Sequence, residues 1–134
     1  MLFRKMKYTL GKEEKLKSNK LIEQLFVEGR RVKSFPIQLR YFQTNHSSEF
    51  PIKVGFSVPK RNIKLAVNRN RIKRVLREVY RKNKYLFSNN LNKQYVFMFI
   101  YMAKEELSYS DLELALQKVC TKFLTKINED EKTH

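Results

Sequence analysis

The pattern of apolar and polar positions is most regular in residues 66–82, where it predicts a helix with two different faces. One face carries apolar residues at the three- and four-residue spacing of a single buried stripe. This stripe contains Ile72, Val75, Leu76, Val79 and Tyr80. Basic residues occupy most of the remaining surface, with Arg71 close to the side opposite the stripe. One flank of the stripe is lined by Arg69, Lys73, Arg77 and Arg81, and Asn70 and Arg74 lie further round.

Shorter patterns predict a first helix and a basic turn. Ser18 or Asn19 is a suitable N-cap, and Gly29 fits the C-terminal end of the helix. The apolar face of this helix contains Leu21, Ile22, Leu25 and Phe26. The residues that follow are expected to form a basic turn: Arg30, Arg31 and Lys33.

Alternating and continuous apolar runs predict three strands. Phe35–Gln43 and Ile52–Val58 alternate, and Pro59 ends the second strand because proline cannot donate a ladder hydrogen bond. Tyr95–Tyr101 is apolar on both faces, which is typical of a central strand covered on both sides.

A capping box at Ser110–Glu113 opens a last helix. Its buried stripe contains Leu112, Ala115, Leu116, Val119, Cys120, Phe123, Leu124 and Ile127. The order helix–strand–strand–helix–strand–helix predicts a small α+β sandwich. At 134 residues the chain suits one domain over residues 1–134, with residues 1–17 as a flexible basic arm.

The charge is extreme and unevenly placed. The net charge is +16, yet residues 85–134 hold 6 lysines against 7 acids and are close to neutral. Residues 53–84 hold 12 Lys or Arg against one acid, Glu78. Like charges at this density repel one another along the helix, so we expect a polyanion, most simply a nucleic acid, to supply the counter-charge.

Composition also bears on the class of protein. One cysteine, Cys120, excludes an intramolecular disulfide, which fits a reducing cytoplasm, and no apolar run is long enough to cross a membrane. His46 and His134 are expected on the solvated surface, and Cys120 as a buried thiol. Without a carboxylate cluster or histidine pair, we expect no catalytic residues in this chain.

Aromatic residues add a second possible contact with nucleic acid. Phe26, Tyr41, Phe42 and Phe56 lie on segments that could border a common groove, where bases of a single strand would stack. For most of them packing in the core is the simpler expectation. For Phe42, which opposes the regular apolar face of its strand, the two alternatives are equally supported.

Several motifs together resemble the bacterial ribonuclease P protein subunit. They are Arg69-Asn-Arg-Ile-Lys-Arg74 with Arg77-Glu78, Val58-Pro-Lys-Arg61, the strand Lys53-Val-Gly-Phe-Ser-Val-Pro-Lys, and the segment Leu16-Lys-Ser…Phe26-Val-Glu-Gly-Arg-Arg. The resemblance covers nearly the whole chain. It implies the order α-β-β-β-α-β-α with a left-handed βαβ crossover, as in the ribosomal protein S5 domain 2-like fold. The extra strand would be a division of residues 52–59 or a short piece near Asn62.

The resemblance also implies a function. The protein subunit assists a catalytic RNA that removes the 5′ leader of precursor tRNA with Mg²⁺, in the cytoplasm, and no obligate protein partner is implied. By motif, the residues expected at the catalytic RNA are Lys60, Arg61, Arg69, Asn70, Arg71, Lys73, Arg74 and Arg77. Those expected at the leader are Phe26, Lys53, Phe56 and Phe42. A metal ion held by Asn68 and Asn70 is a further hypothesis.

Two alternatives remain open from the residues alone. A structural nucleic-acid-binding module, such as a ribosomal protein of related fold, would also explain the charge and the element pattern. An independent nuclease is the third reading, and it would require cleavage by the protein without RNA.

Overall fold

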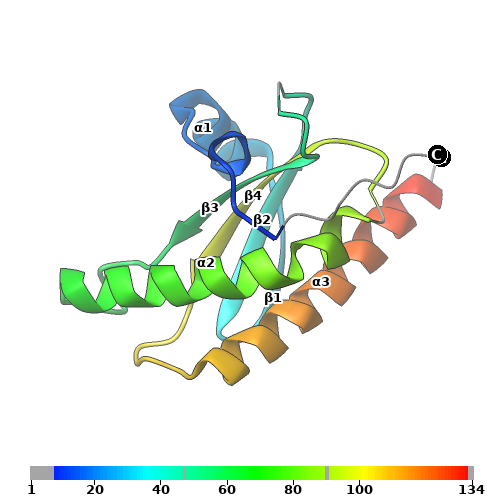
Figure 1. The fold of residues 1–134 in the computed structure, drawn as a ribbon. Coiled ribbons are helices and arrows are strands. Elements are labelled where there is room, and N and C mark those ends of the chain that lie inside the picture. The colour runs from blue at the N-terminus through cyan, green and yellow to red at the C-terminus, as the bar shows by residue number, and fades with distance from the viewer. Residues whose placement is uncertain (1–7, 47, 90, 133–134) are drawn as a thin grey trace.

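The computed structural model describes residues 8–46, 48–89 and 91–132, which form a four-stranded sheet and three α-helices (Figure 1). In chain order the elements are η1 (Lys12–Glu14), α1 (Asn19–Glu28), β1 (Arg30–Ser34), β2 (Ile37–Gln43), β3 (Ile52–Ser57), α2 (Ala66–Ser88), β4 (Tyr95–Tyr101) and α3 (Tyr109–Lys132). The α+β class and the order α-β-β-β-α-β-α are therefore confirmed.

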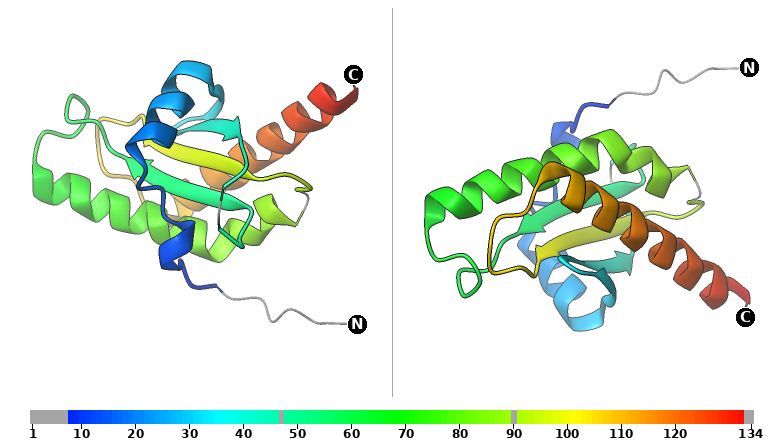
Figure 2. Two further views of the ribbon diagram at one scale, coloured as in Figure 1. Left: turned by 90° about the horizontal axis from the view of Figure 1, so that it is seen from above. Right: turned by 90° about the horizontal axis from the view of Figure 1, so that it is seen from below.

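The sheet has the strand order β1-β2-β4-β3. β2 pairs antiparallel with both β1 and β4, whereas β3 and β4 run parallel and are joined through α2. In the right view of Figure 2, α2 lies in front of the sheet; when that view is turned so that β3 and β4 point upward, the chain passes to the left from β3 to β4. This crossover is left-handed, against the general right-handed preference, as the family resemblance predicts.

The helices cover the two faces of the sheet unequally. α1 lies on one face, and α2 and α3 lie together on the other (Figure 2). β4 is buried along its whole length because its side chains enter both layers in alternation. Phe97 and Phe99 join the large cluster under α2 and α3, and Val96 and Met98 join the small cluster under α1. The predicted central strand is confirmed.

The first helix begins and ends as its sequence predicts. The Ser18 hydroxyl accepts a hydrogen bond from the Leu21 N–H at 3.3 Å, which satisfies one of the free donors of the first turn. Gly29 is the C-cap, and its N–H donates to Leu25 O. A Cβ at this position would lie 2.1 Å from that carbonyl oxygen, so a close approach, and not a left-handed backbone, requires glycine here.

Several elements differ from the prediction, and β2 and β3 are shorter by two residues and one residue than the predicted strands Phe35–Gln43 and Ile52–Val58. The expected basic turn after Gly29 is instead the edge strand β1, so the fourth strand lies neither within residues 52–59 nor near Asn62. Its residues pair along their whole length with β2, and Val32 is buried. α2 continues six residues past position 82, to Ser88. The last helix begins at Tyr109, where Ser108 and not Ser110 caps it by accepting from the Asp111 N–H at 3.1 Å.

The segment before α1 packs against the body of the protein. The Leu16 N–H donates to Val54 O at 2.9 Å, so this segment lies along the outer edge of β3. Lys84, 2% exposed, donates to the Glu14 carboxylate at 2.8 Å and to Thr9 O at 2.6 Å. Residues 1–7 of the predicted arm lie outside the described residues, and flexibility of the arm stays a prediction.

Glu14→Ala is expected to lower the free energy of unfolding by about 3–5 kcal/mol, because it leaves the Lys84 ammonium buried without its counter-charge. The measurement is urea unfolding followed by circular dichroism. Glu13→Ala is the control, since that neighbouring side chain is exposed and its loss should change stability by less than about 0.5 kcal/mol. Equal losses in the two variants would contradict the role of the ion pair.

Candidate nucleic-acid interface

α2 presents its basic residues on the side that is turned away from the core. Ile72, Leu76 and Val79 are buried against the sheet and α3, which fixes the rotation of the helix. We call the following set the α2 basic face: Arg69, Asn70, Arg71, Lys73, Arg74 and Arg77. No side chain caps the N-terminus of α2 and its first turn holds no acid, so the positive end of the helix dipole adds to this charge.

Arg69 is used within the protein. Its guanidinium donates to the carbonyl oxygens of Ile63 at 3.0 Å and Lys64 at 2.7 Å. These bonds hold the turn before α2, which carries Lys60 and Arg61, against the first turns of the helix. We infer a structural role for Arg69 beside any contact with a ligand.

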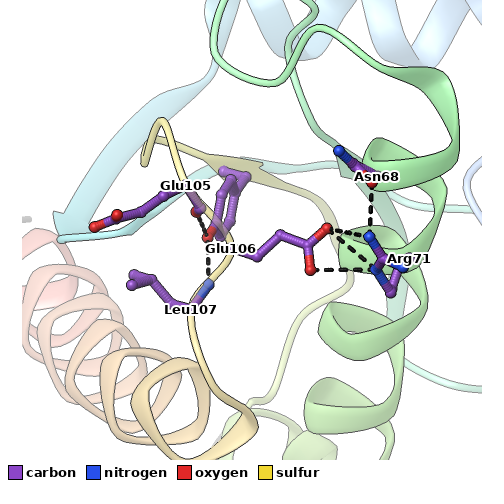
Figure 3. Close-up of polar contacts among 6 residues, drawn as sticks. Asn68, Arg71, Glu105, Glu106 and Leu107 are labelled. Atoms are coloured by element: carbon purple, nitrogen blue, oxygen red, sulfur yellow. Dashed lines mark hydrogen bonds and ion pairs between the residues drawn. The ribbon is translucent and has the colours of Figure 1, made fainter.

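Arg71 also has internal partners. Its guanidinium donates to both carboxylate oxygens of Glu106, in the β4–α3 loop, and to Asn68 Oδ1 at 2.6 Å (Figure 3). The hydrogen bonds and the charge of Glu106 raise the pKa of Arg71 above its ordinary value. Because the Asn68 oxygen faces a cationic donor, this geometry does not support the hypothesis of a metal ion held by Asn68 and Asn70.

Glu78, the acid within the basic helix, is paired with Arg81. The Arg81 guanidinium donates to both carboxylate oxygens of Glu78, and this pairing lowers the pKa of Glu78. Arg81 also donates to Tyr8 O at 2.7 Å. The acid of α2 therefore offsets Arg81, and leaves the α2 basic face without a counter-charge from the helix itself.

The remaining cations of the predicted set point to solvent. In the part of the chain that the structure describes, the side chains of Lys60, Arg61, Lys73 and Arg74 make no hydrogen bond or ion pair. The Arg77 guanidinium lies 5.9 Å from the ring centre of Phe56. Among the described residues, Arg77 forms no ion pair with a carboxylate. These side chains are the ones available to an external polyanion.

The predicted leader residues are divided between the two faces of the sheet. Phe26 and Phe42 lie on the face that α1 covers, where Lys53 donates to Glu13 O at 3.1 Å. Phe56 lies on the opposite face, packed against Phe99 with ring centres 5.9 Å apart. Tyr41 is buried on that opposite face too, so the four aromatic residues do not border one common groove.

Phe26 has a partner that the sequence analysis did not include. Its side chain is 45% exposed, and the Arg40 guanidinium lies 5.1 Å from the centre of its ring. Arg40 also donates to the Phe26 carbonyl oxygen at 3.2 Å. The alternation of β2 places Arg40 on the same face as Phe42, so the strand pattern could have predicted that Arg40 lies at this surface. Arg31 lies directly opposite Arg40 in the β1–β2 register and adds a further cation.

The histidine and the cysteine considered as candidate catalytic residues are both packed within the protein. His46, predicted on the solvated surface, is half-buried: its Nε2 lies 3.3 Å from Pro51 O and 3.2 Å from Tyr95 O, and burial lowers its pKa. The prediction of a surface position was wrong because one of these carbonyls, that of Tyr95, comes from a strand 49 residues away. Cys120 is buried as predicted, and burial raises the pKa of its thiol to about 12. His134 lies outside the described residues.

Among the residues that the structure describes, no three His, Cys, Asp or Glu side chains converge in a way that could hold a metal ion. In the same residues, none of the helices is long and apolar enough to cross a bilayer.

Fold and surface together define a small α+β protein that presents a cationic helix face. Over residues 10–124 the chain matches the family model Ribonuclease P. The Ribonuclease P protein component of Porphyromonas gingivalis is 30% identical over 115 residues, which cover 83% of each chain. That of Chlorobium phaeobacteroides is 42% identical over 79 residues, 57% of this chain and 54% of the relative. The chain belongs to the ribonuclease P protein family.

Solved structures share the fold. The RNase P protein of Staphylococcus aureus superposes with a TM-score of 0.61 at 23% identity, over 81% of this chain and 93% of the other. The RNase P protein of Thermotoga maritima gives a TM-score of 0.65 at 19% identity, over 81% and 96% of the two chains.

Arg69→Ala is expected to lower the free energy of unfolding by about 1–3 kcal/mol, because two carbonyl oxygens lose a charged donor. Arg74→Ala is the matched control on the same helix, and should leave stability within about 0.5 kcal/mol of the parent. Thermal and urea unfolding of both variants test this. Similar stability of the two variants would show that Arg69 does not fix the turn before α2.

Proposed function

We propose that this chain is the protein subunit of ribonuclease P. In this role it binds the catalytic RNA and the 5′ leader of precursor tRNA, and assists Mg²⁺-dependent endonucleolytic removal of that leader. The observation that carries the proposal is the α2 basic face, where Lys73, Arg74 and Arg77 have no carboxylate partner among the described residues of a chain of this family.

The catalytic RNA would meet the α2 basic face. Arginine forks suit phosphate oxygens, and the unpaired cations Arg74 and Arg77 can give two parallel hydrogen bonds each. Lys60 and Arg61 extend this surface because Arg69 holds their turn beside the start of α2. Each phosphate that these residues neutralise would release counter-ions, which favours binding at low salt.

The leader would meet the face of the sheet that carries α1. Phe26 is exposed on one side and supported by Arg40, so its ring can stack on a base of a single strand. Phe42 and Lys53 lie on the same face and would contribute contact area and charge. Phe56 lies on the opposite face, partly buried against Phe99 and Tyr80, and its contact with the leader stays a prediction.

Catalysis would be carried by the RNA. Because no group of acids or histidines among the described residues suits a metal ion, we assign the Mg²⁺ ions to the RNA and derive no step through them from this chain. The contribution of the protein is to offset repulsion between RNA segments and to hold the leader. Such a role places the protein in the cytoplasm, with RNA as its partner.

Cleavage of a precursor tRNA with a 5′ leader tests the proposal directly. The three samples are the protein alone, the cognate catalytic RNA alone, and both together, in Mg²⁺ at near-physiological salt. We expect no cleavage by the protein alone and a large stimulation when protein is added to the RNA. Cleavage by the protein alone would support an independent nuclease, and no stimulation would support a general RNA-binding module.

Arg74→Ala is expected to weaken binding to the catalytic RNA roughly tenfold, about 1.4 kcal/mol, through the loss of a charge-assisted phosphate contact. The slope of log affinity against log salt should fall by about 0.7–0.9. Lys118→Ala, on the exposed side of α3, removes the same charge and serves as the control. Equal effects of the two substitutions would show that net charge alone, and not the α2 basic face, determines the affinity.

A further inference from the structure

The guanidinium of Arg71 uses its Nε and one of its two terminal nitrogens in the free protein. Its Nε lies 3.1 and 3.2 Å from the two carboxylate oxygens of Glu106, and one terminal nitrogen lies 2.8 Å from the first of them (Figure 3). The same terminal nitrogen donates to Asn68 Oδ1. A guanidinium offers two edges for a two-point contact. Glu106 fills one edge, and Asn68 takes a donor from the other.

Glu106 is held in place by the backbone on either side of it. Tyr101 is fully buried, and its hydroxyl donates to Glu105 O at 2.5 Å and accepts from the Leu107 N–H at 3.2 Å. Asn62, from the turn before α2, donates to Tyr101 O at 3.2 Å. The loop therefore presents the Glu106 carboxylate to Arg71 from a fixed backbone, as Figure 3 shows.

The surroundings of this pair suit an exchange of anions. The two side chains are 55% and 38% exposed, and an ion pair at that exposure adds little to stability. Beside it lies a cavity of about 300 Å³ between the start of α2 and the β4–α3 loop, with Lys64, Lys104 and Glu105 on its wall. A phosphate that replaced the Glu106 carboxylate would have room there, with two further cations and one acid nearby.

We propose that Glu106 is a specificity-determining residue that occupies, at Arg71, the place of an RNA phosphate. An RNA that fits the α2 basic face brings a phosphate to Arg71 and displaces the carboxylate. An RNA that does not fit meets a fixed negative charge, which disfavours its binding. This inference rests on the proposed function, since it assumes that the α2 basic face binds RNA.

The test compares Glu106→Gln with Glu105→Gln. Both substitutions remove one negative charge from adjacent exposed residues, but only Glu106 contacts Arg71 through its side chain. Binding of the full-length protein to the cognate catalytic RNA and to an unrelated RNA of similar length is measured over a range of salt concentrations. The same two substitutions are then repeated in an Arg71→Ala background.

We expect Glu106→Gln to tighten binding of the unrelated RNA roughly fivefold more than Glu105→Gln does, with a smaller gain for the cognate RNA, because a freed guanidinium accepts any phosphate. The salt slope for the unrelated RNA should increase by about 0.7–0.9, the value for one additional phosphate contact. In the Arg71→Ala background the two substitutions should behave alike.

The inference is overturned if Glu106→Gln matches Glu105→Gln, or if it weakens binding of the cognate RNA, which would make Glu106 a support for Arg71. Both results presuppose that the unsubstituted protein binds the catalytic RNA and stimulates cleavage. Failure of that binding and stimulation would instead overturn the proposed function, so the two failures are distinct.

Discussion

Burial of β4 on both faces is the constraint on which the other elements depend. A strand whose side chains are apolar in both directions needs a layer on each side. The helix that joins β3 to β4 supplies part of one layer, so α2 has to turn a narrow apolar stripe inward. The same rotation turns its basic residues outward. Packing of the core and exposure of the cations are thus two results of one helix orientation.

The protein neutralises some of its charge internally and leaves the rest unpaired. Arg69 and Arg71 near the start of α2, and Arg81 further along, have partners in three separate loops or segments. Lys73, Arg74 and Arg77 lie between them and have no carboxylate partner among the residues that the structure describes. Internal partners hold the surrounding loops in place, and the unpaired residues supply the attraction for an anion. A chain with Arg69 unpaired would lose the two hydrogen bonds that hold the turn before α2.

Periodicity predicted the elements that carry their own signal, and missed those that depend on distant partners. β4 and the stripe of α2 follow from local pattern alone. β1 has one apolar residue, Val32, and is a strand only because β2 pairs with it. The end of α2 depends on the burial of Lys84, which requires Glu14, seventy residues earlier. The sequence predicted which basic residues form the α2 basic face, but it did not predict their internal partners, such as Glu106.

Pairing of the segment before α1 with β3 also bears on solubility. β3 is an edge strand next to an apolar centre, and an uncovered edge is a template for pairing between molecules. Leu16 occupies part of that edge, and the ion pair of Glu14 with Lys84 anchors the segment that delivers it. At the other edge β1 presents Arg31 and Lys33, which discourage a second chain by charge. The first residues of the described chain therefore cover part of the β3 edge and protect it from pairing with a strand of another molecule.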